Sequence, residues 1–484
     1  MAWRQRRWLD SWKSRGLAGL LVGRAGGRFA LAVLLGAVAG LFSTAFWNAI
    51  AAVSDLLTYR VAALWDAALP LPFPWLSWRF LFPALGALAA TLLARFLFAT
   101  PQRLGVASVM LDARKQWGRI PLRYVPATFV NGVLTIGFGG SAGREAPVVA
   151  MGGSLGAWVA RALKLAPAQR RILVASGVAA AIAAAFNAPL AGVFFALEIL
   201  LGDFAVATLA PIMLAAVAGT VVCRATEGSE AAAHFQVPAY HLVSGWEIIF
   251  YAGLGLLAGV VGHVFIKAME TAEHSFARLP VAWWVRPTLG GLGVGIISLA
   301  LPGVLGNGYD WTIAACSGRL EWHLLLFLLG GKIVATALTL GSGGWGGDLA
   351  PTLFVGAMLG GAYGTGLSAL LGSEVASSGA YAMVGMGAVL ASAIRCPLTA
   401  ILLLFELTSS YQVILPIMVA VATSSFVARR LSRFGLYHRR LQELGVPVSE
   451  APGEPSLARL AVADIMDPQV VTVFEHTPLA ELLR

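Results

Sequence analysis

Two glycine-rich segments of this chain have the residue types and spacing expected of an ion-binding site. The first reads Gly-Gly-Ser-Ala-Gly-Arg-Glu-Ala-Pro at 139–147, and the second reads Gly-Ser-Gly-Gly-Trp-Gly-Gly-Asp-Leu-Ala-Pro at 341–351. Glycines of this kind interrupt a helix, and Pro suits the first turn of the next one. The unpaired N–H groups and partial positive charge of a helix N-terminus favour an anion. We therefore expect anion-binding backbone amides near 145–149 and 349–353, with tight helix packing by the glycines as the alternative.

The two segments belong to an internal duplication with an offset of about 205 residues. Each is followed by a second proline landmark, Asn-Ala-Pro-Leu at 187–190 and Arg-Cys-Pro-Leu at 395–398. Further matched positions are two glycines before the landmarks, Gly177 and Gly385, and two glutamates after them, Glu198 and Glu406. Helices broken at matching positions of two halves indicate an ion site between the repeats, near the bilayer midplane. The repeated glutamates are at least as consistent with a structural role as with a functional one.

The elements that position these segments are membrane helices. The chain is 58% hydrophobic and 12% charged, whereas soluble domains carry about 25% charged residues. Many apolar runs reach the ~20 residues of a spanning helix, and shorter ones suggest tilted or partial spans. We expect an all-α polytopic membrane protein with two inverted-topology repeats. The sequence contains no nucleophile–base pair, metal-ligand spacing or phosphate-binding fingerprint, so we expect neither an enzyme nor a bound cofactor or metal.

The net charge of +10 is concentrated near the ends of the membrane part, which does not suggest a nucleic-acid partner. Arginines and lysines precede the first span and recur at 429–440. Because an excess of these residues marks the cytoplasmic side, we place both termini in the cytoplasm and expect an even number of crossings.

The expected organisation has six parts. They are a cytoplasmic amphipathic helix at 1–28, a first membrane repeat at 29–225, a loop at 226–246, a second membrane repeat at 247–440, a linker at 441–459 and the start of a small α/β domain at 460–484.

These motifs resemble the CLC family of chloride channels and chloride/proton antiporters, over residues 29 to 440. The Gly143–Pro147 segment is similar to the family motif GREGP, and the segments 187–198, 341–351 and 385–406 resemble further signatures in the family's order. Tyr411–Pro416 and Tyr437 also fit the family. The resemblance implies the CLC fold, a homodimer, transported chloride and a bacterial inner membrane. The tail at 462–484 resembles the opening of a CBS domain, which as a complete pair could bind a nucleotide.

The resemblance also implies roles for individual residues. Glu145 would be the gate, a carboxylate that occupies an anion position when charged and leaves when protonated. A helix cap or a pair with Arg144 is the alternative for Glu145, and a surface position is the alternative for Arg144. Tyr437 would donate its hydroxyl to the central anion, with an interfacial tyrosine as the alternative. The expected anion-binding set is Gly143, Arg144, Leu104, Gly105, Gly347, Asp348, Leu349 and Tyr437.

Three positions depart from the family pattern. Ile199 stands where proton-coupled members carry an internal glutamate, although some coupled relatives have a neutral residue there. Leu104 replaces a serine that donates to the central anion. Fluoride-exporting relatives also have an apolar residue there, but they lack the tyrosine that matches Tyr437. Asp348 occupies a helix start that is usually small or apolar, where it would either cap the helix or compete with chloride. Trp345 in the same segment is bulky for its position.

Ile199 favours a passive, uncoupled chloride-conducting protein gated by protonation of Glu145. The alternatives are a chloride/proton antiporter, a transporter of fluoride or another anion, and an anion sensor with little transport.

Overall fold

The fold is helical throughout the ranges that can be described. The computed structural model describes residues 25–68, 77–100, 105–113, 120–227 and 245–445. Within these ranges eight helices are long and apolar enough to cross a membrane, and the only extended pairing is one isolated bridge between two glycines. Three features expected from the sequence lie outside the described residues: most of the N-terminal amphipathic helix, Leu104, and the CBS-like tail.

The first half of the chain runs from α3 to α11. Its helices are α3 (Ala25–Asp55), α4 (Ala62–Ala68), α5 (Phe82–Phe96), α6 (Val106–Leu111), α7 (Tyr124–Gly137), α8 (Glu145–Ala162), α9 (Pro167–Phe186), α10 (Pro189–Phe195) and α11 (Val206–Glu227). Two wider π-helical turns, Leu56–Val61 and Ala196–Leu201, continue α3 and α10.

The second half runs from α12 to α20. Its helices are α12 (Glu247–Arg278), α13 (Arg286–Ala300), α14 (Tyr309–Cys316), α15 (Trp322–Gly341), α16 (Leu349–Leu371), α17 (Ser378–Ile394), α18 (Pro397–Thr408), α19 (Ile414–Leu431) and α20 (Leu436–Glu443). The order α16 to α19 corresponds to α8 to α11 of the first half, as the duplication predicts.

Both proline landmarks form the same helix break. Asn187 follows α9 and Arg395 follows α17, and both residues adopt the left-handed conformation, with φ of 54° and 68°. That conformation stops a helix. Two residues later, Pro189 and Pro397 begin α10 and α18, where proline's missing N–H removes no helical hydrogen bond.

The matched glycines allow close packing at equivalent helix crossings. A Cβ atom on Gly177 of α9 would lie 2.1 Å from the carbonyl oxygen of Gly152 on α8. A Cβ on Gly385 of α17 would lie 2.3 Å from the carbonyl oxygen of Gly356 on α16. These α8–α9 and α16–α17 crossings bring backbones together, as small residues do in membrane helix bundles.

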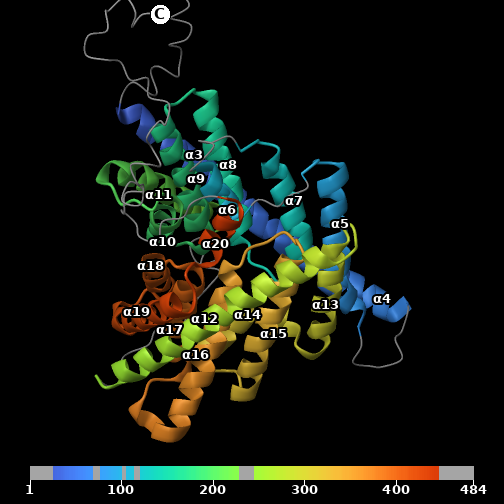
Figure 1. Ribbon diagram of the computed structural model, residues 1–484, viewed down its shortest axis with the longest axis vertical. Helices are drawn as coiled ribbons and strands as arrows, with labels where there is room; N and C mark the ends of the chain where they lie inside the picture. The colour runs from blue at the N-terminus through green and yellow to red at the C-terminus, as the bar shows by residue number, and fades with distance from the viewer. Residues whose placement is uncertain (1–24, 69–76, 101–104, 114–119, 228–244, 446–484) are drawn as a thin grey trace, which may run out of the picture.

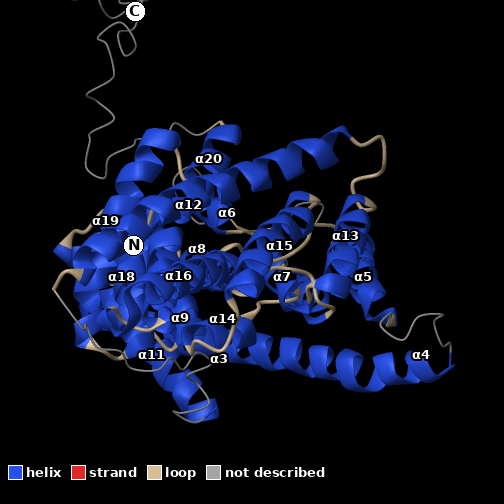
Figure 2. Ribbon diagram, turned by 90° about the horizontal axis from the view of Figure 1, so that it is seen from below, coloured by secondary structure: helices blue, strands red, loops and turns tan. Residues whose placement is uncertain are grey.

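The two halves lie side by side, and the chain's last described helix returns to the boundary between them. In Figure 1 most of the blue-to-green helices of the first half lie in the upper part, and most of the yellow-to-red helices of the second half lie in the lower part. The red α20 lies near the centre and contacts α6 of the first half and α17 of the second. Figure 2, turned by 90°, shows α3 continuing into α4 as one long rod along an edge of the helices. Segments far apart in sequence can therefore build one site near α6, α8, α16 and α20.

Candidate anion-binding site

The two glycine-rich breaks pair directly with each other. The N–H of Gly143 donates to the carbonyl of Gly347, and the N–H of Gly347 donates to the carbonyl of Gly143, both at 2.7 Å. The bridge is antiparallel, as repeats of inverted topology require. A Cβ on Gly143 would lie 2.1 Å from Glu145 Oε2, so glycine leaves the space that this carboxylate occupies. The N-termini of α8 and α16 consequently meet at one point.

Glu145 places its carboxylate at the start of α16. It is the first residue of α8 and is 1% exposed. Its Oε2 accepts a 3.4 Å hydrogen bond from the N–H of Ala350, and its Oε1 accepts a 2.5 Å hydrogen bond from the hydroxyl of Tyr309. The carboxylate thus occupies a position at a helix N-terminus where a free anion would also be stabilised.

Arg144 is buried beside Glu145, which excludes the alternative of a surface arginine. Its side chain is 1% exposed, and its guanidinium donates to the carbonyl of Ala185. The guanidinium carbon lies 4.2 Å from the centre of the Trp47 ring and 5.7 Å from that of Tyr309. A guanidinium held against aromatic rings raises the local potential for anions.

Two contributors to this region, Tyr309 and Lys332, were missed by sequence reasoning. Lys332 of α15 is fully buried, and its Nζ donates to the carbonyls of Val304 and Gly306 at 3.0 and 2.8 Å. These bonds fix the loop that leads into Tyr309, the first residue of α14. Lys332 had a usable signal, because an ionisable residue within an apolar span is functional by default. Tyr309 had none, because it contacts Glu145 from 164 residues away in the chain.

Four of the expected site residues line one cavity, which we call the α20 vestibule. The vestibule has a volume of about 650 Å³. The expected residues among its lining are Gly105, Gly347, Asp348 and Tyr437, and Trp345 lines it as well. Ile199 lies elsewhere, fully buried in the wide turn after α10. Gly347 therefore connects two groups of predicted residues, because it also pairs with Gly143 beside Glu145 and Arg144.

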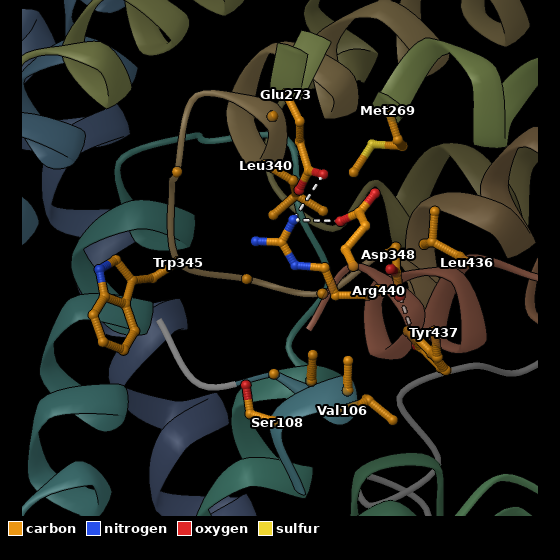
Figure 3. Close-up of a pocket in the computed structure, with 18 of the residues that line it drawn as sticks. Val106, Ser108, Met269, Glu273, Leu340, Trp345, Asp348, Leu436, Tyr437 and Arg440 are labelled. Carbon is orange, nitrogen blue, oxygen red and sulfur yellow. Dashed lines mark hydrogen bonds and ion pairs between the residues drawn. The ribbon is translucent and has the colours of Figure 1, made fainter. Parts of the chain in front are cut away.

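Asp348 and Tyr437 bind each other in this vestibule. The Tyr437 hydroxyl donates to Asp348 Oδ1 at 2.6 Å, and the two side chains point toward one another in Figure 3. Both residues are buried, at 8% and 5% exposure. Asp348 precedes α16 but makes no side-chain capping bond to it, so the geometry does not favour the cap interpretation. The family resemblance implied that the Tyr437 hydroxyl donates to the central anion. In this structure it donates to the Asp348 carboxylate instead.

Ion pairs fasten α20 to α12 along the same vestibule. The Arg439 guanidinium binds the carboxylate of Glu270, and Arg440 Nη1 lies 3.1 Å from Glu273 Oε2 and 3.0 Å from Glu443 Oε2. Figure 3 shows Arg440 reaching Glu273. We refer to the Arg439–Glu270 and Arg440–Glu273 contacts as the α20–α12 ion pairs. They hold the helix that carries Tyr437 against the vestibule.

Each of the two matched glutamates caps a helix of the other repeat. The Glu198 carboxylate accepts from the N–H groups of Leu398 and Thr399, at 3.1 and 2.8 Å, at the start of α18. The Glu406 carboxylate accepts from the N–H groups of Leu190 and Ala191, at 2.9 and 2.8 Å, at the start of α10. Each carboxylate satisfies amide groups that a helix start leaves unpaired. This reciprocal arrangement supports the structural interpretation of both residues.

Removing either cap should destabilise the protein. We expect Glu198→Ala and Glu406→Ala each to cost about 1–2 kcal/mol of folding free energy, because two helix amides lose a charged acceptor. The loss would appear as a lower midpoint of thermal unfolding of the purified protein in detergent. Glu374→Ala, at an exposed position, is the control. Midpoints unchanged in both cap variants would contradict a stabilising role.

Sequence comparison decides the family. The profile described as "Voltage gated chloride channel" matches residues 85–429, more than two thirds of the chain. This chain belongs to the CLC family of voltage-gated chloride channels. CLC proteins transport anions, and the helical architecture described above is the CLC fold.

Individual CLC relatives match most of this chain. A ClcB-like chloride channel protein of Ralstonia nicotianae is 36% identical over 416 residues, which cover 85% of this chain and 96% of the relative. The H(+)/Cl(-) exchange transporter ClcA of Cronobacter sakazakii is 33% identical over 424 residues, covering 84% and 87%. The crystal structure of a slow cyanobacterial Cl-/H+ antiporter matches with a TM-score of 0.78 and 28% identity, covering 86% of this chain and 97% of the antiporter. The exchangers among these CLC relatives fit the antiporter alternative better than an uncoupled channel.

Proposed function

We propose that this CLC protein exchanges chloride for protons across the membrane. The carrying observation is the position of Glu145, whose carboxylate accepts from the Ala350 N–H at the N-terminus of α16. The same carboxylate that fills an anion position can also take up a proton. One group would then alternate between blocking the anion path and carrying the exchanged proton.

The exchange follows from the charge of Glu145. When ionised, the carboxylate competes with chloride for the helix N-terminal amides. When protonated, it has no net charge to hold it there, and chloride takes its place. The buried Arg144 guanidinium keeps the region positive in both states, so that an anion remains stable after the carboxylate leaves. Fixed amides and a nearby cation hold chloride without a direct ion pair that would trap it.

A passive chloride channel is the second candidate function, and Ile199 is the observation that favours it. Its fully buried aliphatic side chain cannot carry a proton at the position where coupled CLC relatives have a glutamate. The ClcB-like relative is described as a chloride channel protein. Against this, the 33% identical relative and the cyanobacterial protein are described as chloride/proton exchangers.

Simultaneous chloride and pH recording in proteoliposomes tests the proposal. Purified protein in vesicles loaded with chloride should release it and, at the same time, move protons in the opposite direction even against a proton gradient. Protein-free vesicles are the control. Rapid chloride release with no proton movement would replace exchange with passive conduction. Release of fluoride but not of chloride would instead make fluoride the substrate.

The proposed function also implies how the protein is oriented in the membrane and that it forms a homodimer. The arginines at 429–440 favour a cytoplasmic position for the C-terminal end of the membrane part, which would make the α20 vestibule the cytoplasmic entrance. A bacterial inner membrane is the setting that the bacterial relatives support. Each subunit of a homodimer would carry its own pathway, as the CLC resemblance implies. Cross-linking in native membranes would test the dimer.

A further inference from the structure

We propose that Asp348 is a second proton-carrying carboxylate, which passes protons between the α20 vestibule and Glu145. The inference rests on the proposed exchange function. Exchange requires a proton path to Glu145 from each side of the membrane, yet Glu145 is 1% exposed and Ile199 cannot carry a proton. An ionisable group between the vestibule and the α16 N-terminus would complete the inner path.

Asp348 stands between these two places. It lines the vestibule, and it lies two residues before Ala350, whose N–H binds Glu145. Gly347, its neighbour, forms the bridge to Gly143 on the α8 side. Asp348 and Glu145 therefore approach the N-terminus of one helix from opposite repeats. Proton transfer between groups near one helix start requires no proton-carrying residue in the wide turn after α10.

Tyr437 connects the two carboxylates electrostatically. Its hydroxyl donates to Asp348 Oδ1 at 2.6 Å, and it lies within electrostatic range of Glu145 and Cys396 as well. A phenol that donates to an ionised Asp348 stabilises the charged state. When Asp348 becomes protonated, the same hydroxyl can rotate to donate to an anion. Protonation of Asp348 would thus make the central position available to chloride.

The other titratable and charged groups around Asp348 come from several elements. Glu145 of α8, Tyr437 of α20 and Cys396 before α18 interact with it or with its tyrosine partner. The remaining vestibule groups are Asp112 after α6, Tyr124 of α7, Arg286 of α13 and the α20–α12 ion pairs. The Glu270 and Glu273 carboxylates of the ion pairs are bound by Arg439 and Arg440. The Asp348 carboxylate accepts a hydrogen bond from the Tyr437 hydroxyl.

The proposed step is a simple proton relay. On the vestibule side, the Asp348 carboxylate forms an O–H bond with a proton from hydronium, which becomes water. That O–H bond later breaks as the Glu145 carboxylate takes the proton, directly or through a water molecule. Asp348 then returns to its ionised form on Tyr437. No electron transfer is involved, and the relay also runs in the reverse direction.

The test compares proton and chloride movement in the wild type and in Asp348→Asn. Asparagine keeps a carbonyl oxygen for Tyr437 but cannot take up a proton. We expect chloride flux to persist while proton movement falls by about 100-fold, the low end of what a positioned proton carrier contributes. Asp348→Glu should restore exchange, because it returns a carboxylate. If Asp348→Asn does not fold, Asp348→Ser takes its place in the comparison.

Glu374→Gln, a carboxylate at an exposed position outside the vestibule lining, is the control. It should retain the wild-type ratio of protons to chloride. A coupled wild type together with a fully coupled Asp348→Asn would overturn the relay and leave the exchange function in place. A wild type that moves chloride without protons would overturn the exchange function and, with it, the relay. A purely structural role for Asp348 would lower both fluxes together and leave their ratio unchanged.

Discussion

The Glu145→Gln variant is expected to conduct chloride without moving protons and without responding to pH. Glutamine has nearly the shape of glutamate but has no charge and cannot release a proton. In the wild type, chloride flux should rise as pH falls, because protonation removes the carboxylate that competes for the α16 amides. A single titrating group changes the ratio of its two states by about tenfold per pH unit, so this dependence is easily measured.

Chloride efflux from proteoliposomes between acidic and neutral pH is the measurement for this variant. Glu374→Gln, at an exposed position, should behave like the wild type. Persistence of the wild-type pH dependence in Glu145→Gln would show that another group is the gate. Persistence of proton movement would show that protons bypass Glu145 altogether.

The Gly385→Val variant is expected to yield no correctly folded protein. A Cβ at this position would lie 2.3 Å from the carbonyl oxygen of Gly356, and backbone cannot move aside as a flexible side chain can. Helices α16 and α17 would have to separate, which would displace the α16 N-terminus that meets Glu145. Ordinary overpacking costs about 1–3 kcal/mol, and we expect a backbone clash of this kind to exceed that range.

Size-exclusion chromatography and thermal unfolding after purification in detergent would measure this effect. Gly366→Val is the control, since a Cβ on Gly366 of α16, the helix that α17 crosses, meets nothing within 4 Å. We expect a monodisperse peak for the control and aggregated or absent protein for Gly385→Val. A stable, monodisperse Gly385→Val would mean that the α16–α17 crossing is not as close as described.

The sequence predicted the fold well because the duplicated residues determine backbone conformation locally. Glycine and proline set backbone geometry at their own positions, so Pro189 and Pro397 could be assigned as break points without knowledge of any contact. The matched Gly177 and Gly385 indicated equivalent close positions, and the structure places both at helix crossings. Apolar run lengths indicated membrane helices for the same reason, since they depend only on residues that are adjacent in the chain.

The candidate site was only partly predictable, because its contacts join distant residues. The two breaks were expected to supply ion-binding amides, and the structure brings them together at Gly143 and Gly347. The contact between Tyr309 and Glu145 has no local signature, because a tyrosine after a glycine-rich turn is ordinary in any loop. The fully buried Lys332 could have been noticed as an isolated charge in an apolar run, but its carbonyl partners could not.

The sequence identified Asp348 as an unusual residue but did not decide its role. The aspartate was unusual for its position, and capping and competition with chloride were both consistent with the sequence. The structure shows a bond from Tyr437 and no side-chain capping bond, so competition with chloride stays a prediction. For Ile199, the sequence did favour one interpretation, and the comparisons favour the other. Its substitution favoured an uncoupled channel, whereas the exchangers among the relatives favour coupling. A missing carboxylate at one position does not exclude a carboxylate at another.

The most direct test of exchange is the membrane voltage at which net current stops, measured with equal chloride on both sides and different pH. For a coupled exchanger, the proton gradient alone drives current, so the zero-current voltage should move away from zero. It should move back to zero in Glu145→Gln, where protons are no longer carried. A wild-type voltage that stays at zero under the proton gradient would contradict the account and establish a pathway for chloride alone.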